Sequence, residues 1–290
     1  DVDQDGYLDR VYFGTTLGLM YRVDLDAAGT GAYPGLVSGR VPAGEWVPRV
    51  IFSATESRLS TPIDPATLPT AQPIFFRPSV VFVADLGEYA LIFGTGDREN
   101  LWRTSGAAGR FYVWTDDTDD PAAVLPVHEG DLQEIPVEYD PDVGPSAENF
   151  LVDRPAGQRG WFMKLDVEER MVTEPFSASG VTVLSAFKPG AGPGAEAGLC
   201  ANRGTSRLFG VLTTNANPLF SDGSDGGRTR YKSEETLVSQ PFVEQAQTAN
   251  PGEQPLKRTG QAAHGVVNFA DMAIFKSLFG KAPGPSAGVP

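Results

Sequence analysis

The chain has 290 residues, with 23 lysines and arginines against 37 aspartates and glutamates, which gives a net charge of −14. This acidic balance argues against nucleic-acid binding, which requires a basic face, and against electrostatic docking on anionic lipid. The single cysteine, Cys200, excludes an internal disulfide framework, and the two histidines, His128 and His264, leave almost no material for a histidine-based zinc site or a Ser-His-Asp triad. No apolar run is long enough to cross a membrane, so we expect no membrane span.

The first nine residues, DVDQDGYLD, have the spacing of the first part of an EF-hand-type calcium loop. Calcium is a hard cation that takes about six to eight oxygen ligands, so a loop that holds it must bring several carboxylates together. The alternate spacing turns the first three aspartates to one side, and Gly6 permits the tight turn. We therefore predict a structural or regulatory Ca²⁺ site with these ligands: Asp1, Asp3, Asp5, the Tyr7 carbonyl and Asp9.

The segment after this loop does not continue as an EF-hand helix. Position twelve of the loop, where a helical EF-hand places a bidentate glutamate, is Tyr12. Residues 10–14 read as a strand, and apolar residues alternate with Gly18, Met20, Arg22 and Asp24 over the next stretch. The metal site is therefore expected at the entrance of a β-hairpin.

The composition and the later segments favour a stack of β-sheets. The 33 glycines and 24 prolines favour many short strands and turns over long helices. Runs that are apolar on both faces, as in residues 79–84, are typical of inner strands. Residues 116–120 read as a solvated acidic turn, and residues 121–155 as a long surface insertion. Further strands are predicted at residues 46–52, 88–96, 110–116, 160–165, 169–175, 181–187, 206–212 and 236–245.

The calcium loop running into YFGTTLGLMYRVDL resembles the C-terminal β-propeller of the PilY family, the tip-associated adhesin and biogenesis proteins of type IV pili. The later order of QPI, an apolar strand, LIFGTG, FYVWTD, GWFMKL and ERMVTEP is similar to the same family. The resemblance implies an all-β fold, a β-propeller segment over residues 1–249 with an incomplete set of blades. The strand spacing suggests about four blades before residue 250, and a propeller leaves unpaired edges unless it closes.

The C-terminal end has a different pattern. Residues 265–280 are predicted to form a short C-terminal α-helix. Their sequence resembles half of a dockerin repeat, with Asn268 and Asp271 at two of the ligand positions. The first, third and fifth ligand positions lack suitable oxygen-bearing side chains, so we expect no calcium there. The predicted organisation of this end is a linker at 250–260, a degenerate dockerin- or EF-hand-like segment at 261–280 and a flexible tail at 281–290.

The resemblance implies a non-enzymatic, calcium-binding propeller of a pilus-associated surface adhesin that supports pilus biogenesis and attachment. Its implied location is extracellular, on the cell surface at the pilus tip. Its implied partners are minor pilins or other pilus-tip proteins and an unknown host or surface ligand, with self-assembly as a further expectation. The sequence contains no signal peptide, and an α-amino group on Asp1 would place positive charge beside the calcium, so we expect further chain upstream.

Two alternatives come from other functional classes. A quinoprotein-like dehydrogenase propeller would need a quinone pocket, and this chain lacks regular tryptophan-docking repeats and a cysteine pair. An FG-GAP-like extracellular binding or filament-forming module would repeat DxDxDGxxD in each blade, and one intact copy occurs here.

Overall fold

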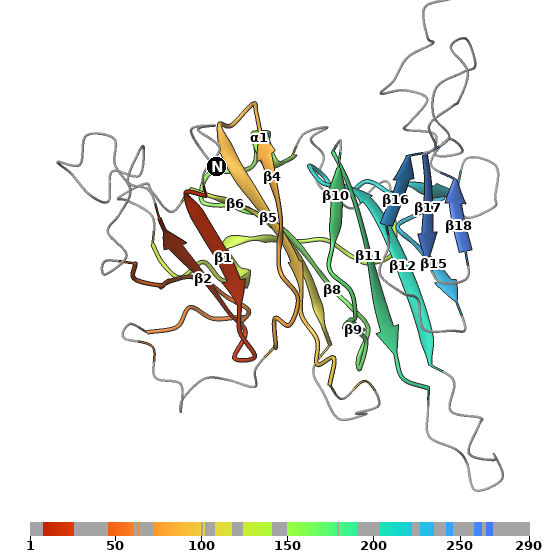
Figure 1. Cartoon of the computed structure of the whole chain (residues 1–290), viewed down its shortest axis with the longest axis horizontal. Coiled ribbons are helices and arrows are strands. Elements are labelled where there is room, and N and C mark those ends of the chain that lie inside the picture. Colours follow the sequence, from red (N-terminus) through yellow and green to blue (C-terminus); the bar gives the residue numbers. More distant parts are fainter. Residues whose placement is uncertain are drawn as a thin grey trace, which may run out of the picture.

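The computed structural model describes residues 8–25, 46–60, 63, 72–99, 101, 108–117, 124–140, 150–178, 180–190, 204–221, 227–234, 242–245, 258–262 and 265–268. Within them the chain consists mostly of antiparallel strands, grouped into sheets that follow one another across the molecule (Figure 1). The sheets do not close into a ring, which agrees with the predicted incomplete propeller.

The first sheet is the predicted hairpin extended by one strand. Its strands, in the order β1-β2-β3, are β1 (Arg10–Gly14), β2 (Leu19–Asp24) and β3 (Arg49–Ser53). The turn between β1 and β2 places Gly18 at φ +73°, a conformation that glycine adopts without steric cost. A register shift opposite Met20 and Tyr21 marks a bulge in the pairing of β2 with β3.

The second sheet includes residues 79–83, and the prediction that the run 79–84 is an inner strand is wrong, because this strand lies at the edge of the sheet with Val80 and Phe82 exposed. Its order is β4-β5-β6-β8-β7, with β4 (Ser79–Val83), β5 (Glu88–Gly94), β6 (Arg110–Asp116), β8 (Gly160–Lys164) and β7 (Gln133–Glu134). Every residue of β6 is buried, because the first and third sheets cover its two faces.

The third sheet follows the same plan. It consists of β9 (Arg170–Met171), β10 (Phe176–Ala178), β11 (Val181–Lys188), β12 (Thr205–Leu212) and β15 (Tyr231–Glu234). A short two-stranded ladder of β13 (Phe220–Ser221) and β14 (Arg228–Thr229) lies between β12 and β15 in the sequence.

The prediction of a linker and a helix at the C-terminal end is wrong for residues 258–262 and 265–268. Residues 258–262 and 265–268 are strands rather than linker and helix, and they form a sheet of β16 (Phe242–Gln245), β17 (Arg258–Ala262) and β18 (Gly265–Asn268). The adjacent β-branched Val266 and Val267 favour a strand when a partner strand is available. Residues 269–290, which include Asp271 and the predicted tail, lie outside the described residues. The α-helix of the described part is α1 (Phe150–Asp153), in the middle of the chain.

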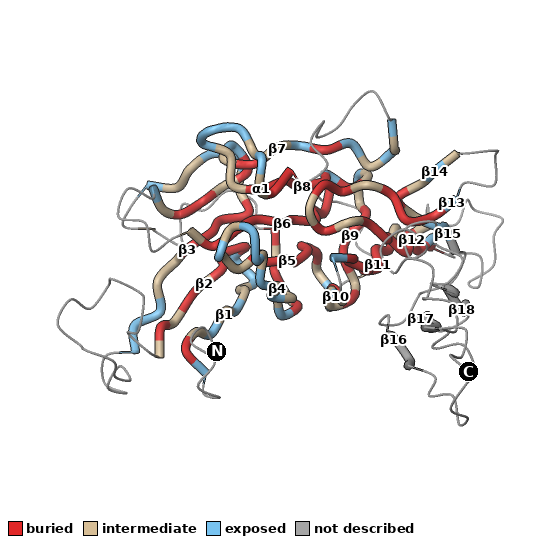
Figure 2. Tube along the Cα trace, turned by 90° about the horizontal axis from the view of Figure 1, so that it is seen from above, coloured by how far each residue is buried: buried red, intermediate tan, exposed pale blue. Residues whose placement is uncertain are grey.

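Two apolar clusters hold the sheets together. One lies between the first and second sheets, where Phe52 packs against Phe93, Tyr112 and Trp114 with ring centroids 5.0–5.6 Å apart. The other joins the second and third sheets, and the Trp161 indole N–H also donates to the Thr213 carbonyl across this boundary (3.1 Å). Figure 2 shows the resulting pattern, with buried inner strands and exposed turns.

The prediction of a surface insertion at residues 121–155 is wrong for its described part. Val127 forms a bridge to Phe52, and Leu132, Ile135, Phe150 and Leu151 are buried in the two apolar clusters. A short 3₁₀ turn, η3 (Glu129–Asp131), lies within this segment. Isolated apolar residues separated by prolines carry no periodic signal, and for that reason the pattern did not reveal their burial. No helix in the described part of the chain is long and apolar enough to cross a bilayer.

Two glycines provide a test of the packing of the second sheet: Gly157, in the turn before β8, and Gly160, the first residue of β8. Gly160 has φ +157°, and a Cβ there would lie 2.2 Å from the Val113 carbonyl oxygen, whereas Gly157 has φ +86° and open space around it. Gly160→Ala should therefore lower the free energy of unfolding by about 2–5 kcal/mol, from backbone strain and the clash together. Gly157→Ala should cost about 1–2 kcal/mol from strain alone. Urea unfolding of both variants checks this, and equal losses would contradict the close approach of Gly160 to β6.

Candidate metal centre

Asp9 is the one predicted calcium ligand within the described residues. It is buried, with 3% of its surface exposed, and its backbone carbonyl accepts a hydrogen bond from the Leu25 amide at 2.6 Å. This bond closes the open end of the β1–β2 hairpin next to the predicted loop. The other predicted ligands lie outside the described residues: Asp1, Asp3, Asp5 and Tyr7.

The donor set fits a hard divalent cation. Asp9 contributes a buried carboxylate directly before β1, and the other predicted ligands are also carboxylate or carbonyl oxygens, the atoms that calcium prefers. Within the described residues, no three His, Cys, Asp or Glu side chains are grouped to hold a metal ion. A site that uses Asp9 therefore needs further ligands from the predicted loop.

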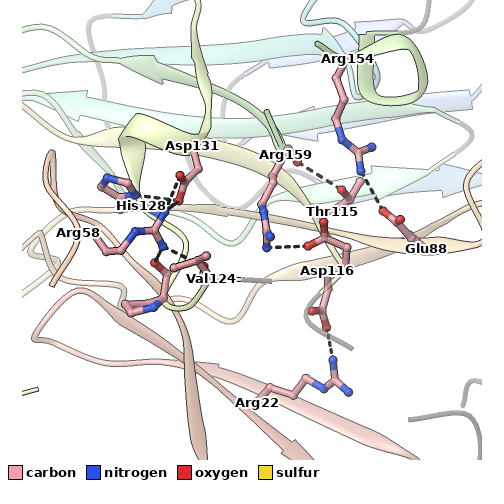
Figure 3. Close-up of polar contacts among 12 residues, drawn as sticks. Arg22, Arg58, Glu88, Thr115, Asp116, Val124, His128, Asp131, Arg154 and Arg159 are labelled. Atoms are coloured by element: carbon pink, nitrogen blue, oxygen red, sulfur yellow. Dashed lines mark hydrogen bonds and ion pairs between the residues drawn. The ribbon is translucent and has the colours of Figure 1, made fainter. Parts of the chain in front are cut away.

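A cluster of charged residues follows directly after Asp9, and we call it the Arg22 network. The Arg22 side chain is 0% exposed; its Nε donates to Asp24 Oδ1 at 2.6 Å and its Nη1 to Asp116 Oδ2 at 2.9 Å. Asp116 ends β6, so this pair joins the first sheet to the second (Figure 3). The members of the network are Arg10, Tyr12, Arg22, Asp24, Arg49 and Asp116.

All three strands of the first sheet contribute to the network. From β1, the Tyr12 hydroxyl donates to Asp116 Oδ2 at 2.6 Å, and Arg10 Nη1 lies 4.0 Å from the same oxygen. From β3, Arg49 Nη2 lies 3.4 Å from Asp24 Oδ2. Because a buried charge is costly unless its partners stay in place, this arrangement fixes the first sheet against the end of β6.

Burial raises the pKa of the Tyr12 hydroxyl well above its ordinary value of 10.0, and the neighbouring Asp116 carboxylate raises it further. Tyr12 therefore remains a hydrogen-bond donor at neutral pH.

The sequence pattern did not reveal the Arg22 network. Alternation along residues 17–25 places the apolar side chains of Tyr21 and Val23 inward, yet the structure buries Arg22 and Asp24 and leaves Tyr21 and Val23 partly exposed. The signal that could have revealed it is the pair of opposite charges two residues apart on one face of a strand.

The prediction of a solvated acidic turn at residues 116–120 is wrong for its first residue, Asp116. Asp116 is buried, and Asp117 accepts a hydrogen bond from Arg159 Nη1 at 2.8 Å. Burial raises the pKa of Asp117, and the Arg159 charge opposes that rise. Residues 118–120 lie outside the described residues.

A second polar cluster ties the segment after β3 to η3. Arg58 Nη2 lies 2.7 Å from both carboxylate oxygens of Asp131, and the same carboxylate contacts His128 Nδ1 at 2.8 Å (Figure 3). His128 is thus held in a structural contact at the boundary of the first two sheets.

Asp116→Asn tests whether the Arg22 network holds the first sheet. It removes the charge that partners a fully buried arginine, so the free energy of unfolding should fall by about 3–5 kcal/mol. Asp117→Asn, in the next position, affects a pair with 16% and 23% of its two side chains exposed and should cost about 1 kcal/mol or less. Equal losses in chemical denaturation would show that the Asp116 pair has no special role.

The raised pKa of Tyr12 predicts a loss of stability at alkaline pH. Above pH 10.0 the unfolded chain releases the Tyr12 proton while the folded chain keeps it, so the free energy of unfolding should fall as pH rises, by up to about 1.4 kcal/mol per pH unit for this group. Tyr12→Phe should reduce this slope while costing about 1 kcal/mol at neutral pH. The measurement is urea unfolding across the alkaline range, and an unchanged slope in the variant would refute the assignment.

Comparison with known proteins shows what the chain is similar to. Residues 1–142, which contain the predicted loop, the first sheet and part of the second, match the family model of the PilY1 beta-propeller domain. No curated protein sequence matches the chain.

The fold is also similar to a solved structure, the crystal structure of the Pseudomonas aeruginosa PilY1 C-terminal domain. The TM-score is 0.58 at 17% sequence identity, over 92% of this chain and 59% of that chain. The chain thus spans about three fifths of that domain, and at this identity the likeness shows the fold. Residues 1–142 thus match the PilY1 beta-propeller domain, and the similarity to the fold of the solved PilY1 domain extends over 92% of the chain.

Proposed function

We propose that the chain is the calcium-binding β-propeller part of a type IV pilus-associated surface protein, with a non-enzymatic role in pilus biogenesis and attachment. The observation that supports this most is the PilY1 beta-propeller match over residues 1–142, which covers both the predicted calcium loop and the hairpin below it. Minor pilins or other pilus-tip proteins, at the cell surface, are the partners that this proposal implies.

The proposed calcium ligands are Asp1, Asp3, Asp5, the Tyr7 carbonyl and Asp9. Bound calcium would neutralise these carboxylates, which otherwise repel one another, and would tie the loop to the start of β1. Ordering of the loop would affect the first sheet through the backbone that follows Asp9. Asp9 is fixed to Leu25 across the hairpin, and the next residues of β1 include Arg10 and Tyr12 of the Arg22 network. We infer that an ordered loop favours the docking of the first sheet on the second.

Calorimetric titration with Ca²⁺ tests the site. Extracellular modules of this kind bind calcium with dissociation constants on the order of 10⁻⁴ to 10⁻³ M, and four aspartates favour the tighter end. Asp9→Asn removes one anionic ligand and should weaken binding at least about tenfold. Saturating calcium, at about 100 times the dissociation constant, should stabilise the unsubstituted protein by about 2.7 kcal/mol.

The matched control is Asp85→Asn, which removes an exposed aspartate from the turn between β4 and β5 and should leave the calcium affinity unchanged. Absence of calcium binding in the unsubstituted chain, or equal affinity in Asp9→Asn, would refute the proposed site. The pilus role is tested separately by deleting the coding sequence in the parent bacterium and counting surface pili, since unchanged piliation would contradict it.

A further inference from the structure

A polar groove of about 600 Å³ lies at the edge of the third sheet that β15 forms. Its wall is formed by β14, β15 and the segment around Glu138 and Tyr139, at the end of the molecule that carries β13 to β15 in Figure 2. This volume is within the range of about 300–1,000 Å³ that is typical of sites for small ligands.

The groove contains two exposed cations in a chain that is otherwise strongly acidic. Arg228 and Lys232 both line it, and neither forms an ion pair with an acidic side chain among the described residues. The Lys232 ammonium lies 5.4 Å from the centroid of the Phe220 ring, which positions it without neutralising its charge. Two such cations are suited to receive a carboxylate or another anionic group.

The rest of the lining is rich in hydroxyl groups, which can both donate and accept hydrogen bonds. The Tyr231 hydroxyl donates to Oε1 of the exposed Glu138 carboxylate at 2.6 Å. Burial and this hydrogen bond raise the pKa of Tyr231 to about 12, so the hydroxyl keeps its proton at neutral pH. The hydroxyl-bearing residues of the lining are Tyr139, Ser221, Thr229, Tyr231 and Ser233.

Each aromatic ring of the groove lies against an arginine, the partly buried Arg207 or the buried Arg230. The Arg207 guanidinium lies 4.4 Å from the centroid of the Tyr231 ring, and Arg230 lies 5.2 Å from that of Tyr139. Arg230 is itself anchored, because its Nη1 donates to the carbonyls of Pro136 and Glu138 at 2.8 Å. Contacts of this kind restrict the two rings, and a restricted side chain loses less conformational entropy when a ligand binds.

We propose that this groove binds an anionic saccharide, with Arg228 and Lys232 receiving its carboxylate and with Glu138 and the hydroxyl-bearing side chains bonding its hydroxyl groups. A purely apolar ligand would leave these polar groups unpaired, whereas a saccharide offers many hydroxyl groups at close spacing. An acidic peptide could satisfy the two cations but would not use the hydroxyl-rich lining, so we favour the saccharide.

The test uses 3′-sialyllactose, a carboxylated trisaccharide, and lactose, its neutral counterpart, in calorimetric titration and saturation-transfer NMR with the full chain. We expect 3′-sialyllactose to bind with a dissociation constant on the order of 10⁻³ M, and lactose to bind at least about tenfold more weakly. The double substitution Arg228→Gln with Lys232→Gln should weaken 3′-sialyllactose binding at least about tenfold, because it removes both charge-assisted contacts.

The matched control is Arg77→Gln with Lys164→Gln, which removes the same total charge from side chains that are 80% and 48% exposed elsewhere on the molecule. It should bind 3′-sialyllactose like the unsubstituted chain, and thermal melting confirms that both double variants are folded. The proposal is overturned if 3′-sialyllactose does not bind, if lactose binds equally well, or if the two double variants behave alike. Binding of hexaglutamate in place of 3′-sialyllactose would also overturn it.

Discussion

The buried pair of Arg22 and Asp116 is the contact on which the arrangement of the first two sheets depends. Neither side chain is exposed to water, so separating them would leave two buried charges without their main partners. Tyr12 and Asp24 complete the hydrogen bonds of the pair, and together these residues come from β1, β2 and the end of β6. The first sheet therefore cannot slide along the second without breaking several charged contacts at once. Apolar packing such as that of Phe52 against Trp114 is compatible with several similar placements of the first sheet on the second, whereas the charged contacts are compatible with one placement.

Close approach of backbone segments explains another part of the fold, the LIFGTG motif at the end of β5. A Cβ on Gly94 would lie 2.2 Å from Met171 Cγ, and one on Gly96 would lie 2.6 Å from Arg170 Cβ. Both glycines thus allow β9 of the third sheet to cross near the end of the second, where the Met171 amide donates to the Thr95 carbonyl at 3.0 Å. The close packing of β9 against the end of the second sheet therefore explains why glycines occur in this motif, which resembles the PilY family.

Much of the strand order could be predicted from the sequence, because β5, β6 and β11 are continuous apolar runs with no competing helical period. Alternation alone places the charge of Arg22 outward, and its partner Asp116 is 94 residues away, so the one local sign of its burial is Asp24, two residues further along the same strand. Leu151 and Phe150 were missed because single apolar residues in a proline-rich segment have no period. Gly265–Asn268 was assigned to a helix on local propensity, but pairing with β17 makes it a strand. Of the predicted calcium ligands, Asp9 alone lies in the described residues, and its burial is compatible with the predicted role.

We expect the proposed calcium ion at the opening loop to order the first hairpin against the second sheet. Hydrogen exchange followed by mass spectrometry, with and without calcium, measures this most directly, because each segment reports its own opening. We predict that calcium slows exchange in β1 and β2 while exchange in β11 and β12, in the third sheet, stays the same. Unchanged exchange in β1 and β2, or an equal slowing in all four strands, would contradict it.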